Sequence, residues 1–205
     1  MEARMIDAAL LPLQRAMLQP PAQALAARGV RADQVTVAGF ALGLLAIPAI
    51  AFHAYWLALV LILMNRIADG LDGAIARIKG PTDRGAFLDI ALDFLFYALI
   101  PVGFALADPA RNALPAAILI AAFVGTGSSF LAFASIAAKR KMSTDAYPTK
   151  GIYYLGGLTE GAETILFFAA ICLFPQAFPI LAGIFAAACF VTTLTRWLMG
   201  WRAFS

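Results

Sequence analysis

Long apolar runs separated by short polar turns dominate the pattern of the chain. A helix needs about 20 apolar residues to cross the hydrocarbon core of a bilayer. The pattern predicts six membrane-spanning helices, at residues 35–53, 55–77, 85–107, 113–138, 151–174 and 177–199. Six crossings use most of the 205 residues. We therefore expect an all-α integral membrane protein, with residues 1–205 as one membrane domain and no separate soluble domain.

The first 32 residues have a different pattern, in which apolar positions recur at helical spacing. This apolar face comprises Ile6, Ala9, Leu10, Leu13 and Met17. The pattern predicts an amphipathic helix that lies along the membrane surface and ends at Pro20-Pro21. A surface helix packed against the bundle explains the same pattern. Asp33 is the expected N-cap of the first span.

Composition and charge support a membrane protein with a defined orientation. Hydrophobic residues make up 62% of the chain and charged residues 13%, which excludes an ordinary soluble domain. Of the 15 Lys and Arg residues, 14 fall on one side of the predicted spans and only Arg111 falls on the other. By the positive-inside rule, both termini are cytoplasmic. We expect a bacterial inner membrane protein whose partners are lipids rather than nucleic acid.

Four carboxylates interrupt the apolar sequence of the second and third spans. They are Asp69, Asp72, Asp89 and Asp93. Spacings of three and four residues place each pair on one helix face, and the turn at 79–84 can bring the two pairs together. Carboxylates inside membrane helices cost roughly 2.5–3.5 kcal/mol each on insertion scales, so a functional role is expected. Arg66, in the same span, is expected only to extend to the lipid headgroups.

Four clustered carboxylates need a counter-ion, since they would otherwise repel one another. Oxygen ligands without His or Cys nearby favour Mg²⁺ or Mn²⁺ over Zn²⁺. Two such ions would balance four negative charges, and a two-metal site suits chemistry at a diphosphate. The sequence therefore predicts an active site that binds two Mg²⁺ or Mn²⁺ ions at the cytoplasmic side of the membrane.

The spacing of these residues resembles the signature of the CDP-alcohol phosphatidyltransferases. The chain reads Asp-x-x-Asp-Gly-x-x-Ala-Arg, then Gly-x-x-x-Asp-x-x-x-Asp, over 25 positions from Asp69 to Asp93. The gap between Arg77 and Gly85 is seven residues, one shorter than the commonest form in the family. That difference falls in a turn, where length varies most easily.

The resemblance implies displacement of CMP from a CDP-linked lipid, usually CDP-diacylglycerol, by an alcohol hydroxyl. It implies that the four carboxylates bind the metal ions and that Asp93 is also the general base. The positions that would contact the CDP-lipid are Gly73, Arg77, Thr82, Gly85, Asp33 and Thr36. Asp33 and Thr36 match the family only in part, because the usual Pro-Asn or Pro-Asp step is replaced by Ala-Asp.

The acceptor alcohol is less well defined. Family acceptors include glycerol 3-phosphate, inositol or its phosphate, serine and other amino-alcohols, and we favour glycerol 3-phosphate. The cationic candidates for an acceptor phosphate on the same side are Lys139, Arg140, Lys141, Lys150 and Arg196. Glu160 and Glu163, expected on one face of the fifth span, could bind hydroxyls or an ammonium group, or pair with a neighbouring Arg.

Two further interpretations remain open. A cation transporter could also carry intramembrane acids, but these would be spread through the bilayer rather than gathered at one end. A silent relative that only binds the CDP-lipid is a third reading, although no signature residue is missing. The family commonly forms homodimers, and small-residue pairs such as Gly39 and Gly43 permit helix contact either between subunits or within one.

Overall fold

The computed structural model describes residues 6–142 and 158–205, and every regular element in these ranges is helical. The elements are α1 (Ile6–Ala27), α2 (Ala32–Leu44), α3 (Ala46–Ala51), α4 (Tyr55–Lys79), α5 (Asp83–Ala107), α6 (Pro109–Lys139), α7 (Gly161–Leu173), the 3₁₀ turn η1 (Pro175–Ala177) and α8 (Phe178–Phe204). The expected all-α class is thus observed. The helices from α4 to α6 begin and end within a few residues of their predicted limits.

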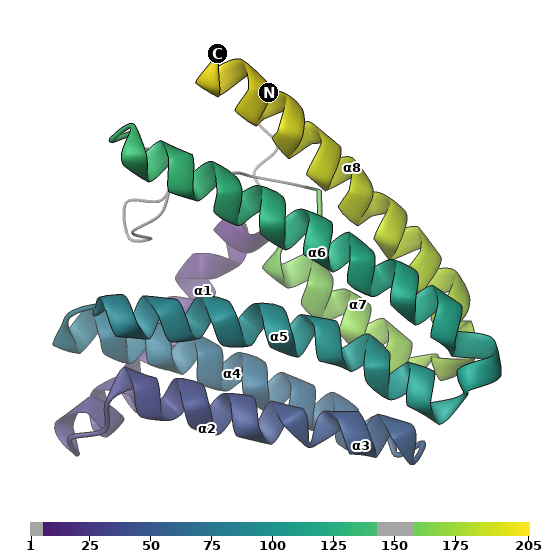
Figure 1. Ribbon diagram of the computed structural model, residues 1–205. Helices are drawn as coiled ribbons and strands as arrows, with labels where there is room; N and C mark the ends of the chain where they lie inside the picture. Colours follow the sequence, from purple (N-terminus) through teal and green to yellow (C-terminus); the bar gives the residue numbers. More distant parts are fainter. Residues whose placement is uncertain (1–5, 143–157) are drawn as a thin grey trace.

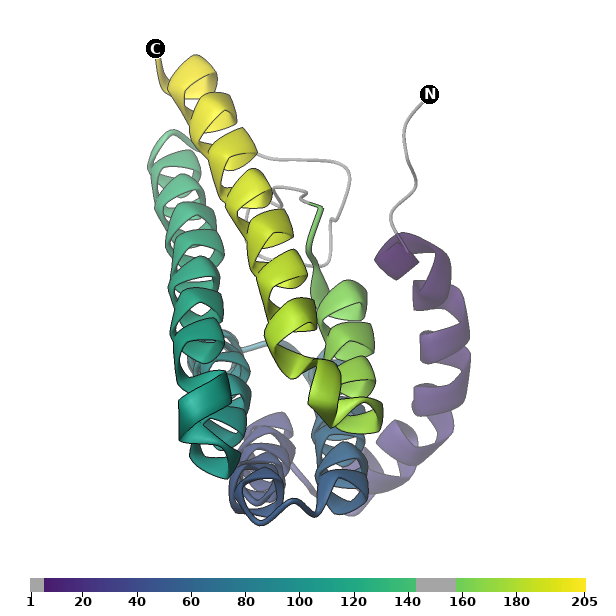
Figure 2. The ribbon, with the colours of Figure 1, turned by 90° about the vertical axis from the view of Figure 1, so that its right-hand side faces the viewer.

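The helices form two groups, which meet where α5 packs against α6, and α7 lies between them (Figure 1). In the first group, α2 packs along α4, α3 lies against both, and α5 packs against α2 and α3. In the second, α6 packs along α8 and also contacts α5. Helix α7 packs against α4 and touches α8, and α1 runs along the side of the bundle against α4 (Figure 2). This arrangement places the first halves of α2 and α5 beside the second half of α4.

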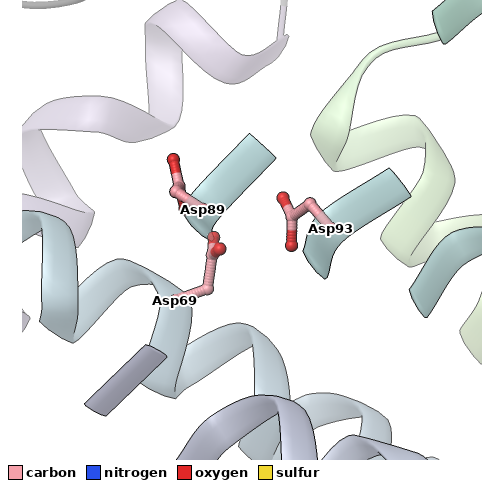
Figure 3. Close-up of side chains that lie close together, drawn as sticks. All are labelled: Asp69, Asp89 and Asp93. Carbon is pink, nitrogen blue, oxygen red and sulfur yellow. The ribbon is translucent and has the colours of Figure 1, made fainter. Parts of the chain in front are cut away.

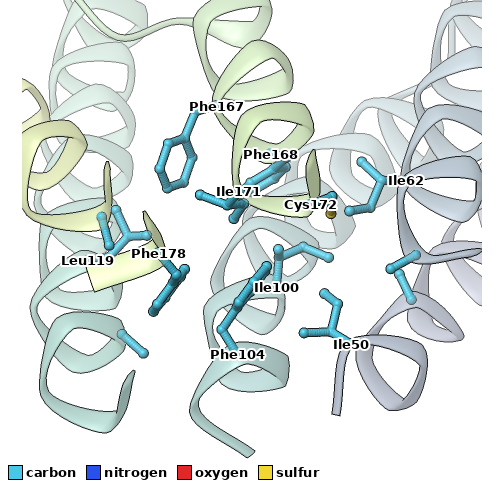
Figure 4. Packing of buried hydrophobic residues seen from close by; sticks show 14 of the residues in the cluster. Ile50, Ile62, Ile100, Phe104, Leu119, Phe167, Phe168, Ile171, Cys172 and Phe178 are labelled. Atoms are coloured by element: carbon cyan, nitrogen blue, oxygen red, sulfur yellow. The ribbon is translucent and has the colours of Figure 1, made fainter. Parts of the chain in front are cut away.

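A single large apolar core joins the two groups. Phe104 of α5 and Phe178 of α8 stack with ring centroids 4.4 Å apart (Figure 4). Phe168 of α7 meets Phe96 of α5 edge to face. All four rings are fully buried. Such aromatic pairs add about 0.5–1.5 kcal/mol each beyond the area they bury. The core therefore fixes α5 relative to α7 and α8 and holds the carboxylates of α5 in place.

Four helices in the described part of the chain are long and apolar enough to cross a membrane. They are Ala32–Ala51, Asp83–Ala107, Pro109–Lys139 and Pro175–Phe204. Helix α4 has 25 residues, but Arg66, Asp69 and Asp72 lower the apolar character of its second half. Helix α7 has only 13 residues. The structure thus supports a helical membrane protein without confirming six full spans.

Two predicted features of the N-terminal region are wrong. Helix α1 continues through Pro20-Pro21 to Ala27 instead of ending at the prolines. Proline removes N–H donors but keeps a helical φ, and packing of the buried Ala22 against Ala74 and Ile75 of α4 holds the helix together. This packing favours a surface helix lying on the bundle.

Asp33 is not the N-cap of the first span. Arg31 occupies that position, and Asp33 lies in the first turn of α2. The span itself is divided, because Leu45 separates α2 from α3. The side chain of Asp33 is therefore available to another helix.

The fifth predicted span is shorter in the structure than expected. Residues 151–157 lie outside the described residues, and α7 begins only at Gly161. Thr192 Oγ1 on α8 accepts hydrogen bonds from the backbone N–H groups of Leu158 and Thr159, at 3.1 and 3.2 Å. These contacts keep residues 158–160 out of the helix, so Glu160 and Glu163 do not share a helical face as predicted.

Candidate active site

Three of the predicted metal ligands converge between α4 and α5. Carboxylate oxygens of Asp69, Asp89 and Asp93 all lie within 4.8 Å of one another (Figure 3). Asp69 comes from the second half of α4, and the other two come from successive turns of α5. The spacing argument from the sequence therefore gives the correct geometry for these three residues.

The fourth carboxylate, Asp72, lies one helical turn further along α4 and is only 5% exposed. It lines the same small cavity, of about 10 Å³, as the other three acids. Its Oδ2 atom is buried and has no hydrogen-bond partner among the described residues. A buried carboxylate oxygen without a donor is costly, so it needs a cation or a ligand group.

The donor set fits a hard divalent ion. All four acidic side chains supply oxygen, and the cavity has room for about one water-sized or ion-sized species. A nucleotide is far larger, so the enclosed space can hold the reacting centre of a substrate at most. These residues would hold Mg²⁺ or Mn²⁺, and bound ions would supply charge to stabilise attacking and leaving oxygens.

Arg66 is a member of this cluster that the sequence interpretation missed. Its side chain is 8% exposed and does not extend to the membrane surface. It donates a hydrogen bond of 2.6 Å to Asp93 Oδ1 and lies 3.8 Å from Asp69. The signal available in the sequence was its position one turn before Asp69, on the face that carries the acids.

A second group of polar residues surrounds the start of α5. Thr82 is the N-cap of that helix, and its hydroxyl accepts a hydrogen bond of 3.0 Å from the Gly85 N–H. Arg84 forms an ion pair with Asp33, with Nε 2.8 Å from Oδ2. A side chain at Gly85 would meet Thr82 Oγ1 and Asp33 Oδ1 at 3.1 and 3.2 Å. Three of the predicted CDP-lipid positions thus lie together at one rim of the site.

The remaining predicted contact residues lie on either side of Asp72. Thr36 of α2 lines the acidic cavity and donates to the Ala32 carbonyl at 3.1 Å. Arg77 is exposed, and its Nη1 would be 3.5 Å from a Cβ added at Gly73. The absence of a side chain at Gly73 therefore leaves space directly beside this guanidinium.

The comparison with known families decides between the interpretations that the sequence left open. The family model described as CDP-alcohol phosphatidyltransferase matches residues 30–200. The chain belongs to the CDP-alcohol phosphatidyltransferase family. It is accordingly an enzyme of the phosphatidyltransferase type, and nothing in the comparisons supports a transporter.

One relative of this phosphatidyltransferase covers most of its length, and a second covers less than half of it. It is 53% identical over 192 residues to the inner membrane protein YnjF of Escherichia coli K12, covering 94% of this chain and 93% of that protein. It is 36% identical over 88 residues to an archaetidylinositol phosphate synthase of Pyrococcus horikoshii, covering 42% and 47% of the two chains. The first relative supports a bacterial inner membrane location.

Solved structures show the same fold at lower identity. The Mycobacterium tuberculosis phosphatidylinositol phosphate synthase PgsA1 with CDP-DAG bound has a TM-score of 0.67 and 22% identity, covering 91% of this chain and 94% of that chain. A complex of PgsA1 with manganese and citrate also gives a TM-score of 0.67 and 22% identity, with 90% and 88% coverage. Metal dependence of the family agrees with the acidic cluster found here.

The residues expected to bind the acceptor differ in their burial and in their hydrogen bonds. Glu160 is the N-cap of α7, and Glu163 Oε2 accepts a hydrogen bond of 3.1 Å from its N–H. Lys139 is exposed at the end of α6. Arg196 of α8 is almost fully buried and donates to the Thr126 carbonyl at 3.0 Å. The two glutamates thus have a clear role as a capping box.

Proposed function

We propose that this enzyme transfers a phosphatidyl group from a CDP-linked lipid, CDP-diacylglycerol or a close analogue, to the hydroxyl of a small polar alcohol. The products are CMP and a phospholipid. The observation that carries the proposal is the convergence of three carboxylates within 4.8 Å beside the buried Asp72. Such a cluster suits a diphosphate with two bound divalent ions, Mg²⁺ or Mn²⁺, of which the cavity would enclose one and the substrate side of the carboxylates would hold the other.

In the proposed reaction, Asp93 removes the proton from the acceptor hydroxyl. The hydroxyl oxygen forms a bond to the phosphorus that carries the lipid, and the bond from that phosphorus to the CMP oxygen breaks. Asp69, Asp72 and Asp89 act as metal ligands, and Asp93 contributes to the same set. Asp93 suits the role of base because it lies at the end of the acidic cluster towards the middle of α5.

The CDP-lipid would bind along the rim that leads to the acids. Its proposed contacts are Gly73, Arg77, Thr82, Gly85, Asp33 and Thr36. Support comes from the gap beside Arg77 left by Gly73, and from the meeting of Asp33, Thr82 and Gly85 at the start of α5. The fixed positive charge of Arg77 suits a phosphate.

The acceptor that we propose is glycerol 3-phosphate. A phosphorylated alcohol needs a cation, and Arg196 is a buried one on the helix pair next to Asp93. Phe94, the residue after Asp93, lies between Asp93 and Arg196. Its ring would be 3.4 Å from a Cβ added at Gly127, and Gly127 follows Thr126, whose carbonyl accepts the hydrogen bond from Arg196. Lys139 is a further candidate. Glu160 and Glu163 stay weaker candidates, since their capping contacts already explain them.

Inositol phosphate is the second candidate acceptor. The Pyrococcus protein is named as an archaetidylinositol phosphate synthase and the Mycobacterium protein as a phosphatidylinositol phosphate synthase. Serine and other amino-alcohols are a third possibility, for which an acidic contact would be required. The first two share a phosphate, so the same cationic contact would serve either.

The test is an acceptor screen with purified protein in mild detergent. We expect CMP release and a new lipid when CDP-diacylglycerol, Mg²⁺ or Mn²⁺ and glycerol 3-phosphate are all present. Chelation with EDTA should abolish turnover, and adding back either ion should restore it. CMP release persisting after thorough EDTA treatment would contradict the metal-dependent mechanism. Absence of any lipid product with every acceptor of the family would contradict the transferase.

We also propose that the whole chain acts as one membrane domain, with residues 1–32 at the interface and 33–205 as the bundle, and that it forms a homodimer. The α2 glycines do not support the dimer, because Gly39 and Gly43 face α4 and α5 of the same chain. Mass measurement in mild detergent and in nanodiscs tests the dimer. A monomeric mass in both would contradict it.

A further inference from the structure

Arg66 lies in an apolar helix, and both aromatic rings and polar side chains contact its guanidinium group. Its guanidinium carbon lies 5.1 Å from the ring centroids of both Phe96 and Tyr97. It donates to the Tyr97 hydroxyl at 3.1 Å and, through Nε and Nη2, to Asn65 Oδ1 at 2.8 and 2.6 Å. Planar stacking and a forked set of donors are properties of arginine that lysine lacks.

This arrangement connects three helices. Asn65 is buried and donates through Nδ2 to the Gly39 carbonyl of α2 at 3.0 Å. Its Oδ1 faces Arg66, which reaches Asp93 on α5. The position of the Asp93 carboxylate therefore depends on the backbone of α2 through two side chains of α4. A packing role alone would not require a charged group that ends on a reacting carboxylate.

The charge of Arg66 also matters for the ions. Four carboxylates carry four negative charges, and Arg66 offsets one of them within hydrogen-bonding distance. A diphosphate brings about two more negative charges into the same space. With two divalent ions alone the occupied site would hold an excess of two negative charges, and Arg66 reduces that excess to one. In a site of low dielectric, one unit charge at this distance has a large effect.

We propose that Arg66 is a positioning residue of the reaction. It fixes Asp93 by one oxygen, so that the second oxygen is presented to the hydroxyl or the ions, and its charge limits the affinity of the empty site for divalent cations. The inference rests on the proposed function for its effect on turnover. Its effect on ion affinity stands separately, since that can be measured without any lipid.

The experiment compares Arg66→Gln and Arg66→Lys with the wild-type protein in two measurements. Mn²⁺ binding is followed by electron paramagnetic resonance in the absence of CDP-lipid. Turnover is followed as CMP release from CDP-diacylglycerol. Removing the positive charge in Arg66→Gln should tighten Mn²⁺ binding at least about fivefold, while kcat falls at least about tenfold. A residue that only supports the fold would lower both.

Arg66→Lys separates charge from geometry. Its charge should keep Mn²⁺ affinity within about twofold of wild type, whereas kcat should stay low because an ammonium cannot hold Asn65, Tyr97 and Asp93 together. Arg111→Gln makes the same chemical change beyond the far end of α5, where Arg111 pairs with Gln176, and should alter neither measurement. Tyr97→Phe removes one hydrogen bond to Arg66 and should lower kcat without changing Mn²⁺ affinity.

The outcomes are distinct. Unchanged or weaker Mn²⁺ binding in folded Arg66→Gln would overturn the charge role, and unchanged kcat would overturn the positioning role. If Arg66→Gln does not fold, the Lys and Phe variants decide, and unaltered kcat in both would overturn the proposal. If wild type shows no turnover with CDP-diacylglycerol, the proposed function fails while the Mn²⁺ comparison still tests Arg66.

Discussion

Asp93 shows how much a single residue in this enzyme depends on its neighbours. One oxygen receives a charge-assisted hydrogen bond from Arg66, and the carboxylate also lies within 4.8 Å of oxygens of Asp69 and Asp89. Its half-buried position admits a substrate hydroxyl as well. A carboxylate held through one oxygen by a fixed cation keeps one orientation, as a base beside metal ions requires.

We predict that Asp93→Asn abolishes CMP release while the protein still folds and inserts. The amide cannot accept the proton from the alcohol, so we expect a loss of at least about a hundredfold. The control is Asp83→Asn, on an exposed carboxylate in the first turn of the same helix, which should keep nearly full activity. Circular dichroism and thermal unfolding would show that both variants are folded. Full activity of Asp93→Asn would remove Asp93 from the role of base.

The sequence could predict the acids of this site but not its arginine. Spacings of three and four residues fix which side chains share a helix face, and this was enough for Asp69, Asp89 and Asp93. An arginine in an apolar run looks the same whether it extends to the headgroups or pairs inside the bundle. The position of Arg66 one turn before Asp69 favours pairing, and the positions of Asn65 and Tyr97 in space decide it.

At the scale of elements, the hydropathy pattern predicted the long helices correctly, but it did not predict where helices are interrupted. The limits of α5 and α6 follow from apolar length, with Thr82 and Asp108 as caps that accept hydrogen bonds from the N–H groups of Gly85 and Arg111. The start of α7 depends on Thr192, a residue more than 30 positions away. A tertiary contact of this kind leaves no local pattern, so the fifth span was drawn too long.

The contact between α2 and α4 is the element-scale feature that most directly shapes the site. A Cβ at Gly39 would lie 2.5 Å from the Ala68 Cβ, so these helices touch where Thr36 of α2 and Asp72 of α4 line the cavity. We predict that Gly39→Ala lowers stability by about 1–3 kcal/mol through overpacking and reduces activity. Thermal unfolding in detergent, with CMP release, measures both effects.

The matched control for this prediction is Gly183→Ala on α8, where an added Cβ meets nothing within 4 Å. It should be neutral or slightly stabilising, since alanine favours helix. Adding Ala68→Gly to Gly39→Ala restores the space and should recover much of the loss. Equal stability of the two single alanine variants would show that the close approach does not constrain the helices.

At the scale of the whole molecule, the acids lie on the same side of the bundle as the end of α6 and the C-terminus (Figure 1). Helices α5 and α6 run antiparallel, and Arg140 after α6 donates to the carbonyls of Ala203 and Phe204 near the C-terminus. Arg111 lies at the other end of α6, bonded to Gln176. The positive-inside rule then predicts that the acidic site and both termini are cytoplasmic.

Labelling of single cysteines in intact bacterial cells tests this orientation. Arg111→Cys should react with a membrane-impermeant maleimide, whereas Ser205→Cys should react only after permeabilisation. The natural Cys172 and Cys189 are buried and should give little background. Labelling of both variants in permeabilised cells shows that each thiol is accessible. The reverse pattern would place the acids on the outer face, where a cytoplasmic CDP-lipid could not reach them.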